Sequence, residues 1–221
     1  MEKKHSVFIT RVVPGAIDLL ERYCDVEVNT EDRVLSKEEL IERVKGKNAV
    51  LCLLTDSIDD DVFEAAGPQC KIFANYAVGY NNIDVVSATK RKIIITNTPG
   101  VLNDATADLA WALLFSVARR IVEADRFTRQ GRFKGWAPEL FLGLDITGRT
   151  LGIIGAGRIG TNFGKKAAGF SMKILYYDIK RNIEFEKECC AQYVEFDELL
   201  KYSDFISIHI PLLPETRHLI G

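Results

Sequence analysis

Short apolar runs alternate with amphipathic stretches along most of this chain. From residue 5 to about residue 97, runs rich in β-branched residues are separated by longer stretches in which apolar positions recur at helical spacing. The strand-like runs are SVFIT, DVEVNT, AVLCLL, KIFANYA and KIIITN, and the helical stretches between them are GAIDLLERYC, SKEELIERVKG, DDDVFEAAG and NIDVVSATKR. Ser36 followed by Glu39 predicts a capping box at one helix start. Strands that alternate with helices predict a parallel, doubly wound α/β sheet.

A second α/β region is predicted after residue 100. Residues 104–130 are predicted to form one long helix, followed by the turn-rich segment GRFKGWAPELFLGLDITG. The alternation then resumes with TLGIIG, KILYYD, QYVEF and DFISIHI, with helices expected to start at Arg158 and Asp197. The sequence therefore predicts two domains, residues 1–100 and residues 101–221, divided at the turn NTPG. The apolar stripe of the long helix consists of Leu109, Leu113, Leu114, Val117 and Ile121.

The segment LGIIGAGRIG carries the most specific chemical signal. Gly155, Gly157 and Gly160 form G-x-G-x-x-G directly after an apolar run and at the head of a predicted helix. The first glycine permits the tight turn, the second lets a pyrophosphate approach the backbone, and the third allows close packing of helix on strand. The free amides of the helix N-terminus would then bind the phosphates. The glycines, together with Arg158 and Ile159 between them, are predicted to bind a dinucleotide.

An acidic residue completes this fingerprint. The next strand-like run ends at Asp178, 18 residues beyond Gly160, where dinucleotide-binding folds place an acid that accepts hydrogen bonds from the adenosine ribose. A carboxylate there repels a ribose 2′-phosphate, which favours NAD. Lys180 and Arg181 lie just beyond and leave NADP open as an alternative.

Composition narrows the class of function. The formal charge of −2 provides no basic excess for a nucleic-acid backbone, so a small-molecule reaction is the better expectation. Five cysteines without a C-x-x-C pair fit reduced thiols in the cytoplasm, and no clustered Cys/His pattern indicates a metal site. The longest apolar helical run, LAWALLFSVA, is too short to cross a membrane.

Four stretches resemble the D-isomer-specific 2-hydroxyacid dehydrogenases, and specifically their glyoxylate/hydroxypyruvate reductase branch. They are ANYAVGYNNID, TNTPGVLNDATADLAWALLFSVAR, LGIIGAGRIG and IPLLPETRHLIG. The resemblance implies that residues 1–100 are part of a flavodoxin-like substrate domain and that residues 101–221 form an incomplete Rossmann domain with a dimerisation arm. It also implies an NAD-dependent reduction of small 2-oxo acids such as glyoxylate and hydroxypyruvate to 2-hydroxy acids.

The resemblance also suggests residue roles. The backbone amides of Val78 and Gly79 would hold the substrate carboxylate, and the less favoured alternative is a simple turn from strand to helix. Thr106 matches a threonine near the cofactor, or it is an ordinary first-turn residue of the helix. His209 and Pro211 begin the loop beside the nicotinamide ribose, where contact is mostly through the main chain, so His209 is not expected to act as a base.

The family also implies a homodimer formed through residues 104–143. The stripe of the long helix is then either part of that interface or part of the core of its own chain, and the sequence favours neither. Trp136 is counted with the same arm.

No catalytic residue is assigned within this chain. The arginine, glutamate and histidine that act in the family lie downstream of the stretch where the chain ends, and only four strands are predicted after residue 150, whereas a full dinucleotide-binding domain has about six. We therefore expect a C-terminally truncated dehydrogenase that is inactive alone. The alternative is a nucleotide-binding fragment or regulatory subunit without turnover.

Overall fold

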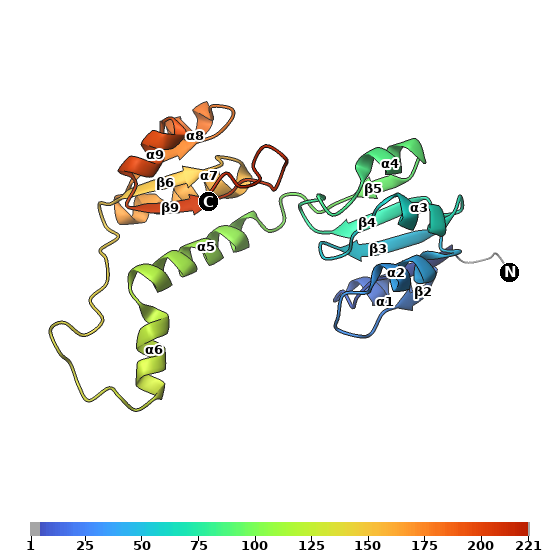
Figure 1. The fold of residues 1–221 in the computed structure, drawn as a ribbon, viewed down its shortest axis with the longest axis horizontal. Coiled ribbons are helices and arrows are strands. Elements are labelled where there is room, and N and C mark those ends of the chain that lie inside the picture. The colour runs from blue at the N-terminus through green and yellow to red at the C-terminus, as the bar shows by residue number, and fades with distance from the viewer. Residues whose placement is uncertain (1–4, 221) are drawn as a thin grey trace. The chain divides into compact units, whose positions relative to one another are not determined.

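The structure, a computed structural model, describes residues 5–220. Contacts within the chain divide it into two compact units, residues 1–100 and residues 101–221. Each unit contains a parallel sheet of its own (Figure 1). The α/β class predicted from the alternating runs is therefore confirmed.

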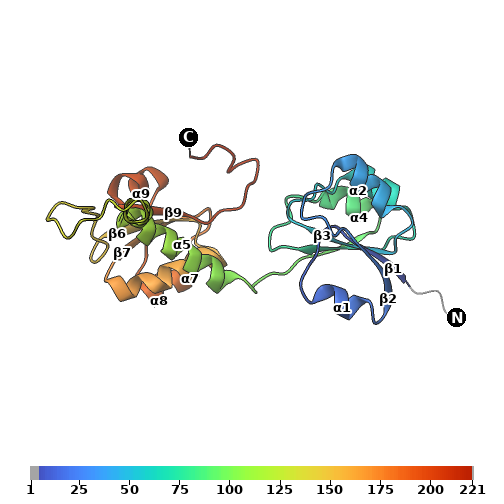
Figure 2. The same ribbon diagram turned by 90° about the horizontal axis from the view of Figure 1, so that it is seen from below.

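The sheet of the first unit has five strands in the order β2-β1-β3-β4-β5. Figure 2 shows α1 on one face of this sheet and α2 and α4 on the other. This arrangement follows from the sequence because the strands of a parallel sheet bury their apolar side chains beneath the connecting helices. The elements are β1 (His5–Ile9), α1 (Ala16–Leu20), β2 (Cys24–Val28), α2 (Lys37–Val44), β3 (Ala49–Leu53), α3 (Asp60–Ala66), β4 (Ile72–Tyr76), α4 (Val85–Lys90) and β5 (Ile94–Thr96).

Side-chain caps fix where helices of the first unit begin. The amide of Glu39 donates to Ser36 Oγ (3.2 Å) and the amide of Ser36 donates to Glu39 Oε2 (2.8 Å), so the predicted capping box is confirmed. Asp59 caps α3 with a single bond, in which its side chain accepts from the amide of Val62 (3.4 Å). Between α3 and the sheet, Phe63 and Phe73 meet edge to face with ring centroids 5.1 Å apart, and both are buried.

The sheet of the second unit has four parallel strands in the order β8-β7-β6-β9. This is the order of the first four strands of a dinucleotide-binding sheet, in which the first strand lies between the second and the fourth. The carboxyl ends of β6 and β9 therefore lie side by side. The elements are α5 (Asn103–Ala118), α6 (Ile121–Arg129), β6 (Thr150–Ile154), α7 (Arg158–Lys166), a 3-10 helix (Ala167–Phe170), β7 (Lys173–Tyr177), α8 (Ile183–Cys189), β8 (Gln192–Tyr193), α9 (Phe196–Tyr202) and β9 (Phe205–Ile208).

The single long helix predicted over residues 104–130 is wrong. The structure has two helices, α5 and α6, which turn sharply at Arg120, where φ is +54° (Figure 1). The last carbonyl of α5, that of Ala118, accepts a hydrogen bond from Leu144 N (2.8 Å), and Gly143 packs so closely that a side chain would overlap this carbonyl. The returning chain therefore occupies the position into which α5 would have continued.

Most of the predicted apolar stripe is not the face that α5 buries in its own chain, although Leu114 packs partly buried against the core. The buried face instead contains Ala107 and Trp111, and the Trp111 ring stacks on Phe163 of α7 with centroids 4.8 Å apart. The indole Nε1 donates to the Phe163 carbonyl oxygen (2.9 Å). The sequence also allowed the apolar stripe of the long helix to belong to the core of its own chain. That alternative is wrong for four stripe residues that are exposed, namely Leu109, Leu113, Val117 and Ile121.

Trp111→Ala should reduce the free energy of unfolding of the second unit by about 3–5 kcal/mol, because it removes the ring that fills the space between α5 and α7. Urea unfolding followed by far-ultraviolet circular dichroism measures this loss. Ile179→Ala is the control, because Ile179 is an apolar residue of the same unit that is 96% exposed. A loss equal to that of the control would contradict the packing described for Trp111.

Candidate functional site

The turn between β6 and α7 leaves no space for side chains at two of its glycines. Gly155 has φ of +95°, and a Cβ there would lie 2.7 Å from the carbonyl oxygen of His209. A Cβ on Gly160 would overlap the carbonyl oxygen of Gly155. Because backbone atoms cannot move aside cheaply, both positions require glycine. These contacts hold β6, α7 and the end of β9 together.

Gly157 differs, because a Cβ there would meet no atom within 4 Å. The open side leads into a cavity of about 380 Å³, lined in part by Ala156, Arg158, Thr161 and Asn182. Gly157 is the residue before the first turn of α7, where helix amides lack partners within the helix. The turn therefore provides free amides, the positive end of a helix dipole and an open space, which together fit a phosphate group.

The structure brings Asp178 to this turn. Its Oδ2 accepts a hydrogen bond from the amide of Ala156 (2.7 Å), and its Oδ1 accepts from the amide of Lys180 (3.3 Å). A carboxylate has about four lone-pair positions, so Asp178 still has positions for a ligand hydroxyl. The residue predicted to contact a ribose thus lies beside the glycines predicted to contact a pyrophosphate.

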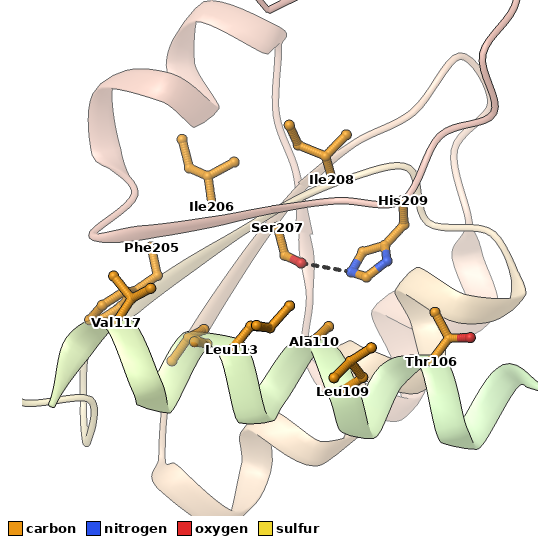
Figure 3. Close-up of a pocket in the computed structure, with 11 residues that line it drawn as sticks. Thr106, Leu109, Ala110, Leu113, Val117, Phe205, Ile206, Ser207, Ile208 and His209 are labelled. Carbon is orange, nitrogen blue, oxygen red and sulfur yellow. Dashed lines mark hydrogen bonds between the residues drawn. The ribbon is translucent and has the colours of Figure 1, made fainter. Parts of the chain in front are cut away.

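His209 lies directly after β9 on the other side of the turn. Its amide donates to the carbonyl oxygen of Ile154 (2.7 Å), and its Nε2 is 2.9 Å from Ser207 Oγ (Figure 3). Burial lowers the pKa of the imidazole, so the ring is neutral near pH 7. Its ring also lies 5.1 Å from that of Phe163. A neutral ring bonded to a serine is a poor proton donor to a substrate.

Thr106 and His209 line one cavity of about 520 Å³ between α5 and β9 (Figure 3). Thr106 lies in the first turn of α5, and its amide donates to the carbonyl oxygen of Leu102 (2.9 Å). Pro211 follows on the exposed loop, where its carbonyl oxygen accepts from Thr216 Oγ1 (2.6 Å). The remaining lining is mostly apolar.

In the first unit, Val78 and Gly79 lie in the loop after β4, at the carboxyl edge of the sheet. The carbonyl oxygens of both residues accept hydrogen bonds from asparagine side chains of the same unit. Asn97 Nδ2 donates to the Val78 carbonyl oxygen (2.8 Å), and Asn75 Nδ2 donates to the Gly79 carbonyl oxygen (2.9 Å). The amides of Val78 and Gly79 donate to no acceptor within residues 5–220. The bonded carbonyl oxygens fix the orientation of the loop, and the two amides without an acceptor are available to an anionic ligand.

A buried polar network beneath this loop was not predicted from the sequence. Asn75 Nδ2 also donates to Asn82 Oδ1 (3.2 Å), and Asn82 Nδ2 donates to the carbonyl oxygens of Leu53 and Asp56 (3.1 and 3.0 Å). The Asp56 carboxylate accepts from Thr10 Oγ1 (2.5 Å). Polar residues at the carboxyl ends of apolar strands, such as Thr10 after β1 and Asn75 near the end of β4, indicate polar contacts at this edge of the sheet but not which side chains meet.

Other kinds of site find no support in the part of the chain that the structure describes. Within residues 5–220, no group of three or more His, Cys, Asp or Glu side chains could hold a metal ion. No helix in that range is long and apolar enough to span a membrane.

Comparison with known proteins identifies the second unit. Residues 111–221 match the family model for the NAD binding domain of D-isomer specific 2-hydroxyacid dehydrogenases. This family match agrees with the dinucleotide-binding geometry described above, because the matched residues include the glycine turn and Asp178.

Relatives extend the likeness over nearly the whole chain. A glyoxylate reductase of Thermococcus litoralis is 52% identical over 99% of this chain and 67% of its own length. A glyoxylate reductase of Korarchaeum cryptofilum is also 52% identical, over 99% of this chain and 66% of its own length. The crystal structure of the TT0316 protein from Thermus thermophilus superposes with a TM-score of 0.88 at 42% identity, covering 97% of this chain and 67% of that one.

The chain thus spans about two thirds of the length of the relatives it matches. The sequence identity to these relatives, the family match and the dinucleotide-binding turn all indicate the same family. The chain belongs to the D-isomer-specific 2-hydroxyacid dehydrogenase family.

Proposed function

We propose that this chain carries the cofactor-binding part of an NAD(P)-dependent reductase that converts small 2-oxo acids, such as glyoxylate and hydroxypyruvate, to 2-hydroxy acids. The observation that carries the proposal is the turn at Gly157, which combines free helix amides, open space and the Asp178 carboxylate. Relatives named as glyoxylate reductases support the substrate class. When bound, the nicotinamide cofactor supplies the hydride.

Each assigned residue has a role toward the cofactor. The amides of Gly157, Arg158, Ile159 and Gly160 bind the pyrophosphate, and the side chain of Arg158 adds a positive charge there. Gly155 shapes the turn, because its own amide donates to the carbonyl oxygen of Tyr177. The Asp178 carboxylate accepts hydrogen bonds from the adenosine ribose. Thr106, His209 and Pro211 contact the nicotinamide end.

The loop of the first unit binds the substrate carboxylate. Val78 and Gly79 donate through their amides, and the carboxamides of Asn75 and Asn97 keep the loop carbonyls turned toward the protein. Amides held in place beforehand cost little reorganisation when the anion binds.

A second candidate function is nucleotide binding without turnover by the chain itself. Reduction of a 2-oxo acid needs a proton donor as well as a hydride. Within the described residues, His209 is bonded to a serine, and no histidine forms an ion pair with a carboxylate. We therefore expect NADH to bind to the purified chain without appreciable oxidation by glyoxylate. Sustained loss of nicotinamide absorbance, in proportion to the amount of chain, would refute this second candidate.

We also propose that the chain forms a homodimer through residues 104–143. Its support is the exposed apolar surface of this segment, in which Leu113 is 59% exposed and Trp136 is 85% exposed.

Gly157→Ala should weaken NADH binding by about tenfold or more while leaving the fold intact, because the added methyl group enters the space kept for the phosphates. The φ of Gly157 is −75°, which alanine adopts without strain. Gly160→Ala is the contrasting variant, because its methyl group meets backbone and should lower the melting temperature. Fluorescence titration with NADH and thermal unfolding measure the two effects. Unchanged NADH affinity in Gly157→Ala would contradict the proposed cofactor site.

Glyoxylate should shift the backbone amide resonances of Val78 and Gly79 more than those of other loops in a nitrogen-15 NMR titration. The reason is that a carboxylate accepting a hydrogen bond deshields the donating amide. Asn97→Ala removes the donor to the Val78 carbonyl and should reduce the affinity for glyoxylate. Acetaldehyde, which has no carboxylate, is the control ligand. Equal shifts with both ligands would argue against a carboxylate site.

Light scattering should give a mass of about twice the 24.8 kDa of one chain, because burial of the exposed stripe favours association. Leu113→Glu should return the mass to that of a monomer by placing a charge in the interface. A monomeric mass for the unmodified chain would rule out the proposed dimer.

A further inference from the structure

The arginine nearest to Asp178 in the loop after β7 is already paired. Arg181 Nε donates to Glu186 Oε1 (2.6 Å) and Arg181 Nη2 donates to Glu186 Oε2 (2.9 Å), so both carboxylate oxygens are engaged. The Arg181 side chain is 61% exposed, whereas the Glu186 side chain is 16% exposed. Two parallel bonds of this kind are the strongest arrangement between arginine and a carboxylate.

Glu186 is held in place from its other side. The hydroxyl of Tyr176, a buried residue of β7, donates to Glu186 Oε1 (2.6 Å) and accepts from the amide of Asn182 (2.8 Å). Arg181 and then Tyr176 lower the pKa of Glu186, so the carboxylate is ionised at neutral pH. Because the tyrosine is fixed in the core, Glu186 cannot follow Arg181 outward, and the arginine stays near α8.

This pairing bears on the choice of dinucleotide. A ribose 2′-phosphate beyond Asp178 needs a nearby cation, and an arginine in this loop is the usual partner. Arg181 would have to give up two charge-assisted hydrogen bonds and leave Glu186 with only the tyrosine. Lys180 forms no ion pair within the described residues, but an ammonium offers a single point charge and not a two-bonded fork.

We propose that Glu186 is a specificity-determining residue that withholds Arg181 from a ribose 2′-phosphate and thereby favours NAD over NADP. The inference rests on the proposed cofactor site and adds to it a residue that does not touch the cofactor. It identifies the Tyr176–Glu186–Arg181 chain of contacts as the cause of the preference, in addition to the negative charge of Asp178.

Glu186→Gln tests the inference. Glutamine keeps an acceptor oxygen for Tyr176 but loses the charge that holds Arg181. The affinity for NADPH should rise about tenfold, the difference that one charge-assisted arginine–phosphate contact can make, while the affinity for NADH changes by less than about twofold. Calorimetric or fluorescence titration of the full chain with each nucleotide provides both values, and circular dichroism checks the fold.

Two further variants assign the effect to Arg181. Arg181→Ala alone should leave NADPH affinity unchanged, because the arginine is already occupied. In the double variant Glu186→Gln with Arg181→Ala, the gain should disappear. Glu198→Gln removes one charge from α9 of the same unit, and Glu198 is exposed and has no side-chain hydrogen bond or ion pair within the described residues, so this control should change NADPH affinity by less than about twofold.

The outcomes distinguish a failure of the proposed role of Glu186 from a failure of the proposed cofactor site. NADH binding that persists while Glu186→Gln leaves NADPH affinity unchanged would overturn the role of Glu186 alone. A loss of NADPH affinity in Arg181→Ala would do the same, because it would show that the arginine already contacts the phosphate. Failure of the unmodified chain to bind either nucleotide at millimolar concentration would overturn both the cofactor site and the inference.

Discussion

The close backbone approach at the turn after β6 is the constraint on which the second unit depends. The amide of Gly155 donates to the carbonyl oxygen of Tyr177 (2.9 Å), and the amide of His209 donates to that of Ile154 (2.7 Å). The ends of β6, β7 and β9 are therefore fixed to one another where the chain enters α7. No side chain fits at Gly155 or Gly160, so the positions of the helix amides, Asp178 and His209 all follow from one backbone geometry.

Hydrophobic periodicity in the sequence was enough to predict most strands and helices of the fold. Strands of both sheets were found because β-branched runs bury their side chains beneath helices. Helix α8 was missed because its buried face consists of Phe185 alone, and its start depends on the Asn182 cap. The break between α5 and α6 was also missed, because it is imposed by Leu144 and Gly143, which lie well beyond the helix and contact it only in the folded unit.

Some features of the candidate site could be predicted from the sequence and others could not. The glycines and Asp178 could be predicted because their spacing alone reflects a strand, a turn and a helix. The network of Asn75 and Asn82 could not, because hydrogen bonds between separate strand ends depend on which strands are neighbours. The buried face of α5 was likewise left open, since helical spacing shows that a face is apolar but not which surface covers it.

The distribution of cations suggests how the second unit discriminates among anions. Lys165 is paired with Glu188 (2.6 Å) and Arg181 with Glu186, whereas Arg158, at the head of α7, forms no ion pair within residues 5–220. Arg158 therefore leaves a guanidinium available at the pyrophosphate end of the proposed site, whereas at the ribose end the arginine is neutralised and only the single point charge of Lys180 remains. Since the remaining attraction comes mainly from backbone amides, which act only at short range, an anion is recognised by where it is placed and not by its total charge. A ligand with an extra phosphate at the ribose end would gain little from this surface, although its total charge is larger.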